Sequence, residues 1–165
     1  MIEVEASVEI ERSPLDVWDY MSRIDKWWLV SNPDEHIELS VIGKGNIEKG
    51  TEFVLKERIA GIRGEAIITI SEYQPPKQLE WKSLSAKYRL LGMGLDVEEG
   101  GIFKISPTEK GCVLSHRVWG KLDCGLMGII AEWFFKNILK GERKDFEHTH
   151  RELLFIKGEV ESQIA

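Results

Sequence analysis

The first residues alternate between apolar and polar side chains, and this pattern runs from Ile2 to Glu11. A period of two places the apolar set on one face of a β-strand and the polar set on the other. The sequence therefore predicts that the chain opens with a strand that has one dry face and one solvated face.

Two short helices are expected to follow this strand. Ser13 can cap a helix and Pro14 can occupy its first position. The apolar residues of this helix recur at three-residue spacing and are expected on one face: Leu15, Trp18 and Met21. Asp25 is expected to cap a second helical turn that holds the tryptophan pair 27–28, before a loop at 32–34.

Between residues 37 and 119 the chain is rich in β-branched and aromatic residues and is repeatedly interrupted by glycine and proline. This composition favours short strands, and consecutive hairpins favour antiparallel pairing. The expected strands cover residues 37–43, 51–60, 62–73, 78–85, 101–106 and 111–121. The stretch 84–99 follows neither period cleanly, so an extended strand, a bulge and a flap all stay open there.

A long helix is expected towards the C-terminal end. No proline occurs from Leu126 to Val160, and apolar residues cluster along this stretch. Gly141 lowers helix propensity by roughly 1 kcal/mol relative to alanine, so it can bend or divide the element. The predicted fold class is α+β: an antiparallel β-sheet of about seven strands against a long helix, in a single domain over residues 1–165.

Composition and charge limit the classes of partner. Of the 165 residues, 42% are apolar and 30% charged, which can supply both a core and a polar surface. The net charge of -6 repels phosphate backbones, so we expect no nucleic acid partner. The acidic start of the chain and the lack of an apolar run of roughly 20 residues argue against a secretory signal and a membrane span. We therefore expect a cytoplasmic protein.

Recognisable metal, cofactor and nucleophile motifs are missing from the sequence. Cys112 and Cys124 lack the close pairing of a zinc or redox motif, so free thiols are expected. His148 and His150 diverge by roughly 200° on a helix, so they cannot easily share a metal ion. No Gly-x-Ser-x-Gly elbow, His-Glu-x-x-His motif or phosphate loop occurs. We expect neither a metal nor a cofactor.

Four segments carry a resemblance to a known family: residues 13–18 (SPLDVW), 50–53 (GTEF), 73–81 (YQPPKQLEW) and 111–115 (GCVLS). In this order of elements they resemble the START-like helix-grip superfamily, which includes polyketide cyclase-like, lipid-transport-like and birch-pollen-allergen-like proteins. Cys112 stands where such proteins often carry threonine. The resemblance implies a curved sheet that grips the long helix around an elongated cavity. It also implies binding of lipids, aromatic metabolites or polyketides, with catalysis in only some members.

Strand parity selects two polar residues for the expected cavity. Glu57 shares its face of strand 51–60 with apolar side chains, and His116 does so in strand 111–121. Polar groups on a dry face need partners or water, and a ligand cavity offers both. The alternative is that the strand edges differ and that Glu57 lies at a solvated strand end.

Large apolar side chains are expected to form the cavity walls, although such residues also fill cores. The candidate ligand-binding residues are Glu57, Trp81, His116, Phe135, Leu139 and Phe146. The function that follows is binding of a small hydrophobic molecule, such as a lipid, isoprenoid or aromatic polyketide-like metabolite, between sheet and helix. Two alternatives stay open: a cyclase- or hydratase-type enzyme acting on such a ligand, and a protein-interaction module resembling chaperone-activator domains.

Overall fold

The structure, a computed structural model, describes residues 1–43, 46–59, 61–90, 92–122, 133, 136–137 and 140–162. Within these residues, seven antiparallel strands form one sheet in the order β1-β7-β6-β5-β4-β3-β2. Their bounds are β1 (Ile2–Ile10), β2 (His36–Ile42), β3 (Glu52–Ile59), β4 (Ile62–Gln74), β5 (Gln78–Leu90), β6 (Met93–Pro107) and β7 (Cys112–Leu122). The α+β fold class predicted from the sequence is confirmed.

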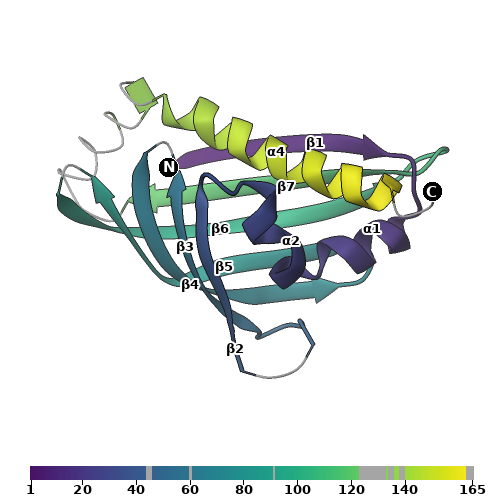
Figure 1. Cartoon of the computed structure of the whole chain (residues 1–165), viewed down its shortest axis with the longest axis horizontal. Helices are drawn as coiled ribbons and strands as arrows, with labels where there is room; N and C mark the ends of the chain where they lie inside the picture. Colours follow the sequence, from purple (N-terminus) through teal and green to yellow (C-terminus); the bar gives the residue numbers. More distant parts are fainter. Residues whose placement is uncertain are drawn as a thin grey trace.

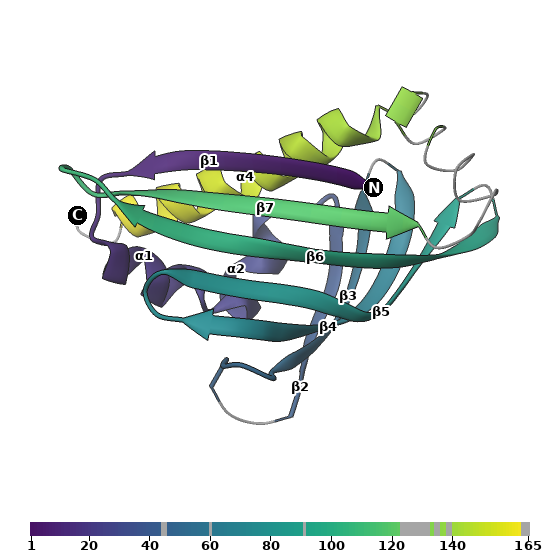
Figure 2. The same cartoon turned by 180° about the vertical axis from the view of Figure 1, so that it is seen from behind.

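The described helices lie on one side of the sheet. Helix α4 (Gly141–Ser162) runs along that side, and α1 (Pro14–Met21) and α2 (Ile24–Ser31) lie on the same side, as Figure 1 shows. The view from behind in Figure 2 shows the strands in front of these helices. The space between sheet and helices therefore contains both the packed core and any interior site.

Strand β1 has the two faces that its sequence predicts. Val4, Ala6, Val8 and Ile10 are buried, while the residues between them are exposed. The strand pairs with β7 along its whole length, from Ile2 opposite Gly120 to Ile10 opposite Cys112. Because the period is two, this pairing puts all the apolar residues of β1 towards α4.

Helix α1 begins as predicted but buries a different stripe. The Ser13 side chain accepts a hydrogen bond from the Asp16 backbone N–H, and proline occupies the first turn. Trp18 and Met21 are buried with Val17, whereas Leu15 is 57% exposed. The prediction for Leu15 was wrong, because steps of three residues drift around a helix that has 3.6 residues per turn.

Replacing the capping serine by alanine is expected to destabilise the protein. Ser13 Oγ accepts from the Asp16 N–H at 3.2 Å and donates to Asp16 Oδ2 at 2.7 Å. Ser13→Ala removes both bonds, and loss of such a cap typically costs about 0.5–2 kcal/mol of unfolding free energy. Urea unfolding followed by circular dichroism measures this loss. Ser85→Ala, at an exposed strand position, is the control, and equal stability of the two variants would contradict the prediction.

Helix α2 begins earlier than the sequence suggested. It starts at Ile24 with Arg23 at the N-cap position, and the Arg23 side chain makes no capping hydrogen bond. Asp25 was expected to be the cap but lies in the first turn. The prediction failed because α1 ends at Met21 and leaves only two residues between the helices. An acidic residue in the first turn still interacts favourably with the helix dipole.

Residues 84–99 complete a long hairpin made by β5 and β6. Both strands extend past their predicted ends, and the chain turns beside Gly92, whose φ of 83° suits glycine. The pairing of β5 with β6 shifts register between Lys82 and Lys87. An extended strand with an irregularity is therefore the correct one of the open alternatives. The extension brings residues of both strands, Tyr88 and Glu99, into the interior.

Helix α4 accounts for the second half of the predicted long helix. It begins at Gly141, directly after Lys140, whose φ of 51° lies outside the right-handed helical region. Residues 123–132, 134–135 and 138–139 lie outside the described part of the chain, so the first half of the prediction is not tested there. The element thus begins at the glycine that was expected to bend or divide it.

The buried stripe of α4 changes character along the helix. Leu153, Ile156 and Val160 pack into the apolar core. The same stripe continues towards the start of the helix with buried polar residues: His148, Thr149 and Glu152. One helix face therefore closes a dry core at one end and presents ionisable groups at the other.

Two further expectations concern the class of protein. No helix in the described ranges is long and apolar enough to cross a bilayer. Cys112 is a buried free thiol, as expected, and burial raises its pKa. Cys124 lies outside the described residues.

Candidate functional site

A cavity of about 180 Å³ lies between the sheet and the polar half of the α4 stripe. Apolar side chains make up much of its wall, among them Leu55, Ile68, Trp81, Phe103 and Val118. Its ionisable lining residues are Glu57, Tyr88, Glu99, His116, Asp145, His148 and Glu152. A dry cavity of roughly 150 Å³ accepts benzene, so this volume suffices for a small aromatic or branched aliphatic group.

Three of the residues selected from the sequence line this cavity. Glu57 and His116 are 7% and 4% exposed and face inward, as strand parity predicted, and Trp81 lies beside them. Phe146 is 42% exposed and stacks on His150, so it does not line the cavity. Its position, two residues before the inward-facing His148, points it away. Phe135 and Leu139 lie outside the described residues.

Tyr88 links two buried carboxyl groups. Its hydroxyl oxygen lies 2.7 Å from Oε1 of Glu57 and 2.8 Å from Oε2 of Glu99. A phenol has one O–H and can donate to only one carboxylate, so the other carboxyl must be protonated and donate to the phenol oxygen. Glu57, Tyr88 and Glu99 together therefore carry two protons, one on the phenol and one on a carboxyl group.

The pKa shifts of these three groups agree with a proton kept on one of the two carboxyl groups. Burial raises the pKa of Glu57. Burial and the neighbouring charge of Glu57 raise the pKa of Glu99 to about 8. Burial and the charges of both glutamates raise the pKa of Tyr88 well above its ordinary value. At neutral pH the tyrosine therefore stays a phenol and the carboxyl pair keeps a proton.

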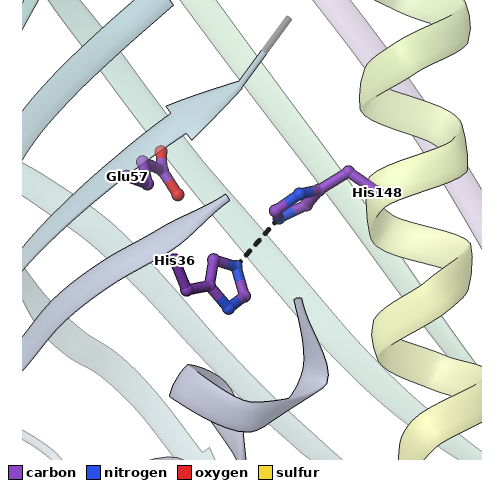
Figure 3. A group of neighbouring side chains, drawn as sticks. All are labelled: His36, Glu57 and His148. Atoms are coloured by element: carbon purple, nitrogen blue, oxygen red, sulfur yellow. Dashed lines mark hydrogen bonds between the residues drawn. The ribbon is translucent and has the colours of Figure 1, made fainter. Parts of the chain in front are cut away.

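A second cluster joins the start of β2 to α4. Nε2 of His36 lies 3.1 Å from Nε2 of His148, with Glu57 on β3 facing both rings in Figure 3. Oε1 of Glu152 lies 3.4 Å from Nε2 of His36 and 3.6 Å from Nε2 of His148. Nδ1 of His148 lies 2.6 Å from Oε2 of Glu35. Buried charge is thus concentrated where α2, β2, β3 and α4 meet.

The two histidines of this cluster have opposite charge preferences. Burial alone would lower the pKa of His148, but the nearby carboxylates of Glu152 and Glu35, the latter hydrogen-bonded to it, raise it to about 10. Burial and the charge of His148 lower the pKa of His36 to about 4, against the pull of Glu152. Burial would raise the pKa of Glu152, yet the neighbouring imidazoles of His116 and His148 hold it well below its usual range.

His116 is held by aromatic neighbours. Its ring stacks on Phe103 at 3.6 Å, and the Trp81 indole N–H donates to its Nε2 at 3.4 Å. Its Nδ1 lies 3.4 Å from Oε2 of Glu152, outside hydrogen-bond geometry, and is unpartnered within the described chain. Nearby, burial raises the pKa of Asp145 to about 7. The ring is therefore held in place by Phe103 and Trp81, with Nδ1 beside Glu152.

Sequence reasoning missed several polar residues at this site. His148 and His150 do not share a site, as expected, but His148 meets His36, more than 100 residues away in the chain. A signal for part of the cluster was present: counting back by four residues from Leu153 and Ile156 reaches Thr149 and Glu152, and a second step of four reaches His148. Tyr88 and Glu99 fell in the stretch that was left open.

Comparisons with known proteins agree with this architecture. The chain is 24% identical over 155 residues to an uncharacterized protein, MT1597, of Mycobacterium tuberculosis, covering 91% of this chain and 99% of that protein. The structure of TTHA0849 from Thermus thermophilus has a TM-score of 0.70 at 14% identity and covers 99% of both chains. A START superfamily protein from Mycobacterium smegmatis has a TM-score of 0.64 at 18% identity, covering 98% of both.

A third similar solved structure is that of a two-domain protein. The di-domain ARO/CYC StfQ of steffimycin biosynthesis has a TM-score of 0.65 at 16% identity, covering 98% of this chain and 52% of StfQ. At such identities these likenesses show the fold alone. The sequence profile of the family described as "Polyketide cyclase / dehydrase and lipid transport" matches residues 1–147, so the chain belongs to this family and has its START-like fold.

Proposed function

We propose that the protein binds a small, mainly apolar molecule that carries a hydroxyl or carbonyl group. The observation that carries this proposal is the cavity between sheet and α4, with apolar walls and a few buried polar groups at fixed positions. Ligand pockets typically combine apolar walls with sparse polar groups that set the ligand's orientation. A lipid, an isoprenoid or an aromatic polyketide-like metabolite has this chemistry.

Glu57 and His116 are the residues proposed to orient the polar end of the ligand. They reach the cavity from different strands, β3 and β7, and both are buried. The free Nδ1 of His116 can donate to a carbonyl or hydroxyl oxygen, and a Glu57 oxygen can accept from a hydroxyl. Trp81 holds the His116 ring from the other nitrogen.

The comparisons support the class of ligand. Family membership is consistent with binding of a hydrophobic ligand or with cyclase-type activity in general. The structurally similar StfQ is an ARO/CYC di-domain protein of the steffimycin biosynthetic pathway. An aromatic polyketide-like metabolite is therefore one of the ligands proposed for this chain.

Removing either orienting group is expected to weaken ligand binding. Glu57→Gln and His116→Leu should each reduce affinity by roughly 1–3 kcal/mol, because a buried ligand group loses its hydrogen-bond partner. The measurement is calorimetry with the molecule recovered from purified protein. Glu65→Gln, at an exposed position on neighbouring β4, is the matched control. Unchanged affinity in both folded cavity variants would contradict the orienting roles.

Acid–base catalysis on such a ligand is the second candidate, favoured by Tyr88 between two carboxyl groups. A protonated carboxyl inside an apolar cavity can donate a proton to a carbonyl or a leaving hydroxyl, as a cyclisation with loss of water requires. Tyr88→Phe separates the two candidates. Retained ligand binding with lost turnover supports catalysis, whereas a cavity that releases its ligand unchanged supports binding.

A further inference from the structure

We propose that His36 Nε2, His148 Nε2 and Glu152 Oε1 form a three-ligand site for a divalent transition-metal ion such as Zn²⁺ or Fe²⁺. Zn²⁺ and Fe²⁺ are ions of intermediate softness. In protein sites that leave a coordination position for water or substrate, such ions are bound by two imidazoles and one carboxylate. The three residues come from β2 and α4, and Figure 3 shows both imidazole rings beside Glu57. The site does not depend on the apolar ligand proposed above.

The spacing of the three atoms fits an ion better than it fits ion pairs. The sides of the triangle measure 3.1, 3.4 and 3.6 Å. Its circumscribed radius is about 1.95 Å, so an ion can lie about 2.0–2.1 Å from all three atoms, just above their plane. A charge-assisted N–H···O bond would contract to about 2.7–2.9 Å, well below the two distances to Glu152.

The outer nitrogen of each histidine has the partner that a metal ligand needs. Nδ1 of His36 contacts the backbone carbonyl of Trp28, which can only accept, so Nδ1 carries the proton and Nε2 is left with its lone pair. Nδ1 of His148 lies 2.6 Å from Glu35 Oε2, and Arg151 Nη2 holds the same oxygen at 3.2 Å. Imidazole ligands commonly donate their second N–H to a carbonyl or carboxylate, which orients the ring.

The charge around the triangle favours a cation. Four carboxyl-bearing residues line the cavity, and no lysine or arginine does so among its described lining residues. One ligand-capable oxygen of Glu57 lies within 4.8 Å of the nitrogens of both histidines. Glu57 is therefore near enough to accept a hydrogen bond from a water or hydroxyl held by the ion.

Metal titration of the whole chain tests this site. Protein stripped with a chelator and dialysed is titrated with Co²⁺, followed by its visible absorption, and then with Zn²⁺ in competition. The proposal predicts one ion per chain and a rise in melting temperature on binding. Loss of a residue that hydrogen-bonds a metal ligand typically lowers metal affinity by roughly 10–100-fold, and Glu35→Gln should show a loss in this range. His148→Gln and Glu152→Gln each remove a ligand and should lower metal affinity further.

His150→Gln is the matched control, because His150 lies on the same helix two residues away and stacks on Phe146 outside the cavity. It should bind Co²⁺ like the unmodified protein. Lack of Co²⁺ and Zn²⁺ binding by the folded protein would overturn the proposal, as would equal losses in His150→Gln and His148→Gln. If the ligand variants do not fold, X-ray absorption of the Zn²⁺-loaded protein decides: imidazole nitrogens around zinc support the site, and their absence overturns it.

Discussion

Val118→Phe is expected to weaken binding of a neutral apolar dye, N-phenyl-1-naphthylamine, by roughly 10–100-fold. Val118 lies on β7 two residues after His116 and lines the cavity. The larger ring would occupy space that a ligand needs, and overpacking typically costs about 1–3 kcal/mol, which corresponds to that loss of affinity. Fluorescence titration of the dye measures the change.

Val113→Phe is the control for this substitution, because Val113 lies on the same strand but on its other face. The same change in volume there should leave dye affinity within about twofold, a difference of less than 0.5 kcal/mol. Thermal unfolding shows whether both variants are folded. Equal dye binding by Val118→Phe and the unmodified protein would place the dye outside the cavity and contradict the account of the walls.

Leu153→Ala is expected to lower the unfolding free energy by about 2–5 kcal/mol. Leu153 is fully buried on α4 and packs in the apolar core. Truncation removes buried methyl groups and leaves a void that the strands fill only in part. Because marginal stability is common, this single change can unfold a large fraction of the protein. Urea unfolding monitored by circular dichroism gives the difference.

Leu154→Ala provides a direct comparison, because the next residue on the helix undergoes the same chemical change while 47% exposed. Its loss should stay within about 0.5 kcal/mol, as for other surface substitutions. If both leucine variants lost equal stability, α4 would not pack on the sheet through the Leu153 stripe. The cavity wall formed by the same stripe would then also be in question.

Local periodicity was enough to predict most of the fold. The alternation in β1 and the Ser13-Pro14 start of α1 depend on neighbouring residues only, and the structure confirms both. Leu15 failed because steps of three residues drift around a helix, and Asp25 failed because α2 begins earlier than expected. Such boundaries depend on how α1 and α2 pack, which a single sequence does not reveal.

The candidate site was predictable only where it lies on regular strands. Glu57 and His116 face inward because parity on β3 and β7 sets their direction. His36 escaped notice because the pairing of β2 with β3 is irregular between His36 and Glu38, so parity carries no information there. Its meeting with His148 depends on the approach of α4 to β2, a contact between distant parts of the chain.

Helix α4 explains how the fold combines a packed apolar core with buried polar groups. Buried residues spaced three or four apart change from leucine and isoleucine to glutamate, threonine and histidine along a single face. The apolar end holds the helix on the sheet, so the polar end is fixed without needing a core of its own. Burial of ionised groups is costly unless they are paired, and His148 pairs with both Glu35 and Glu152.

Native mass spectrometry of the protein purified from its source, followed by solvent extraction, tests ligand binding most directly. We expect one small molecule per chain, mainly apolar and bearing a hydroxyl or carbonyl group, and we expect the Val118→Phe protein to lack it. Protein that carries no molecule and binds none from a panel of lipids, isoprenoids and aromatic polyketides would contradict the account. That result would favour a protein-interaction module instead.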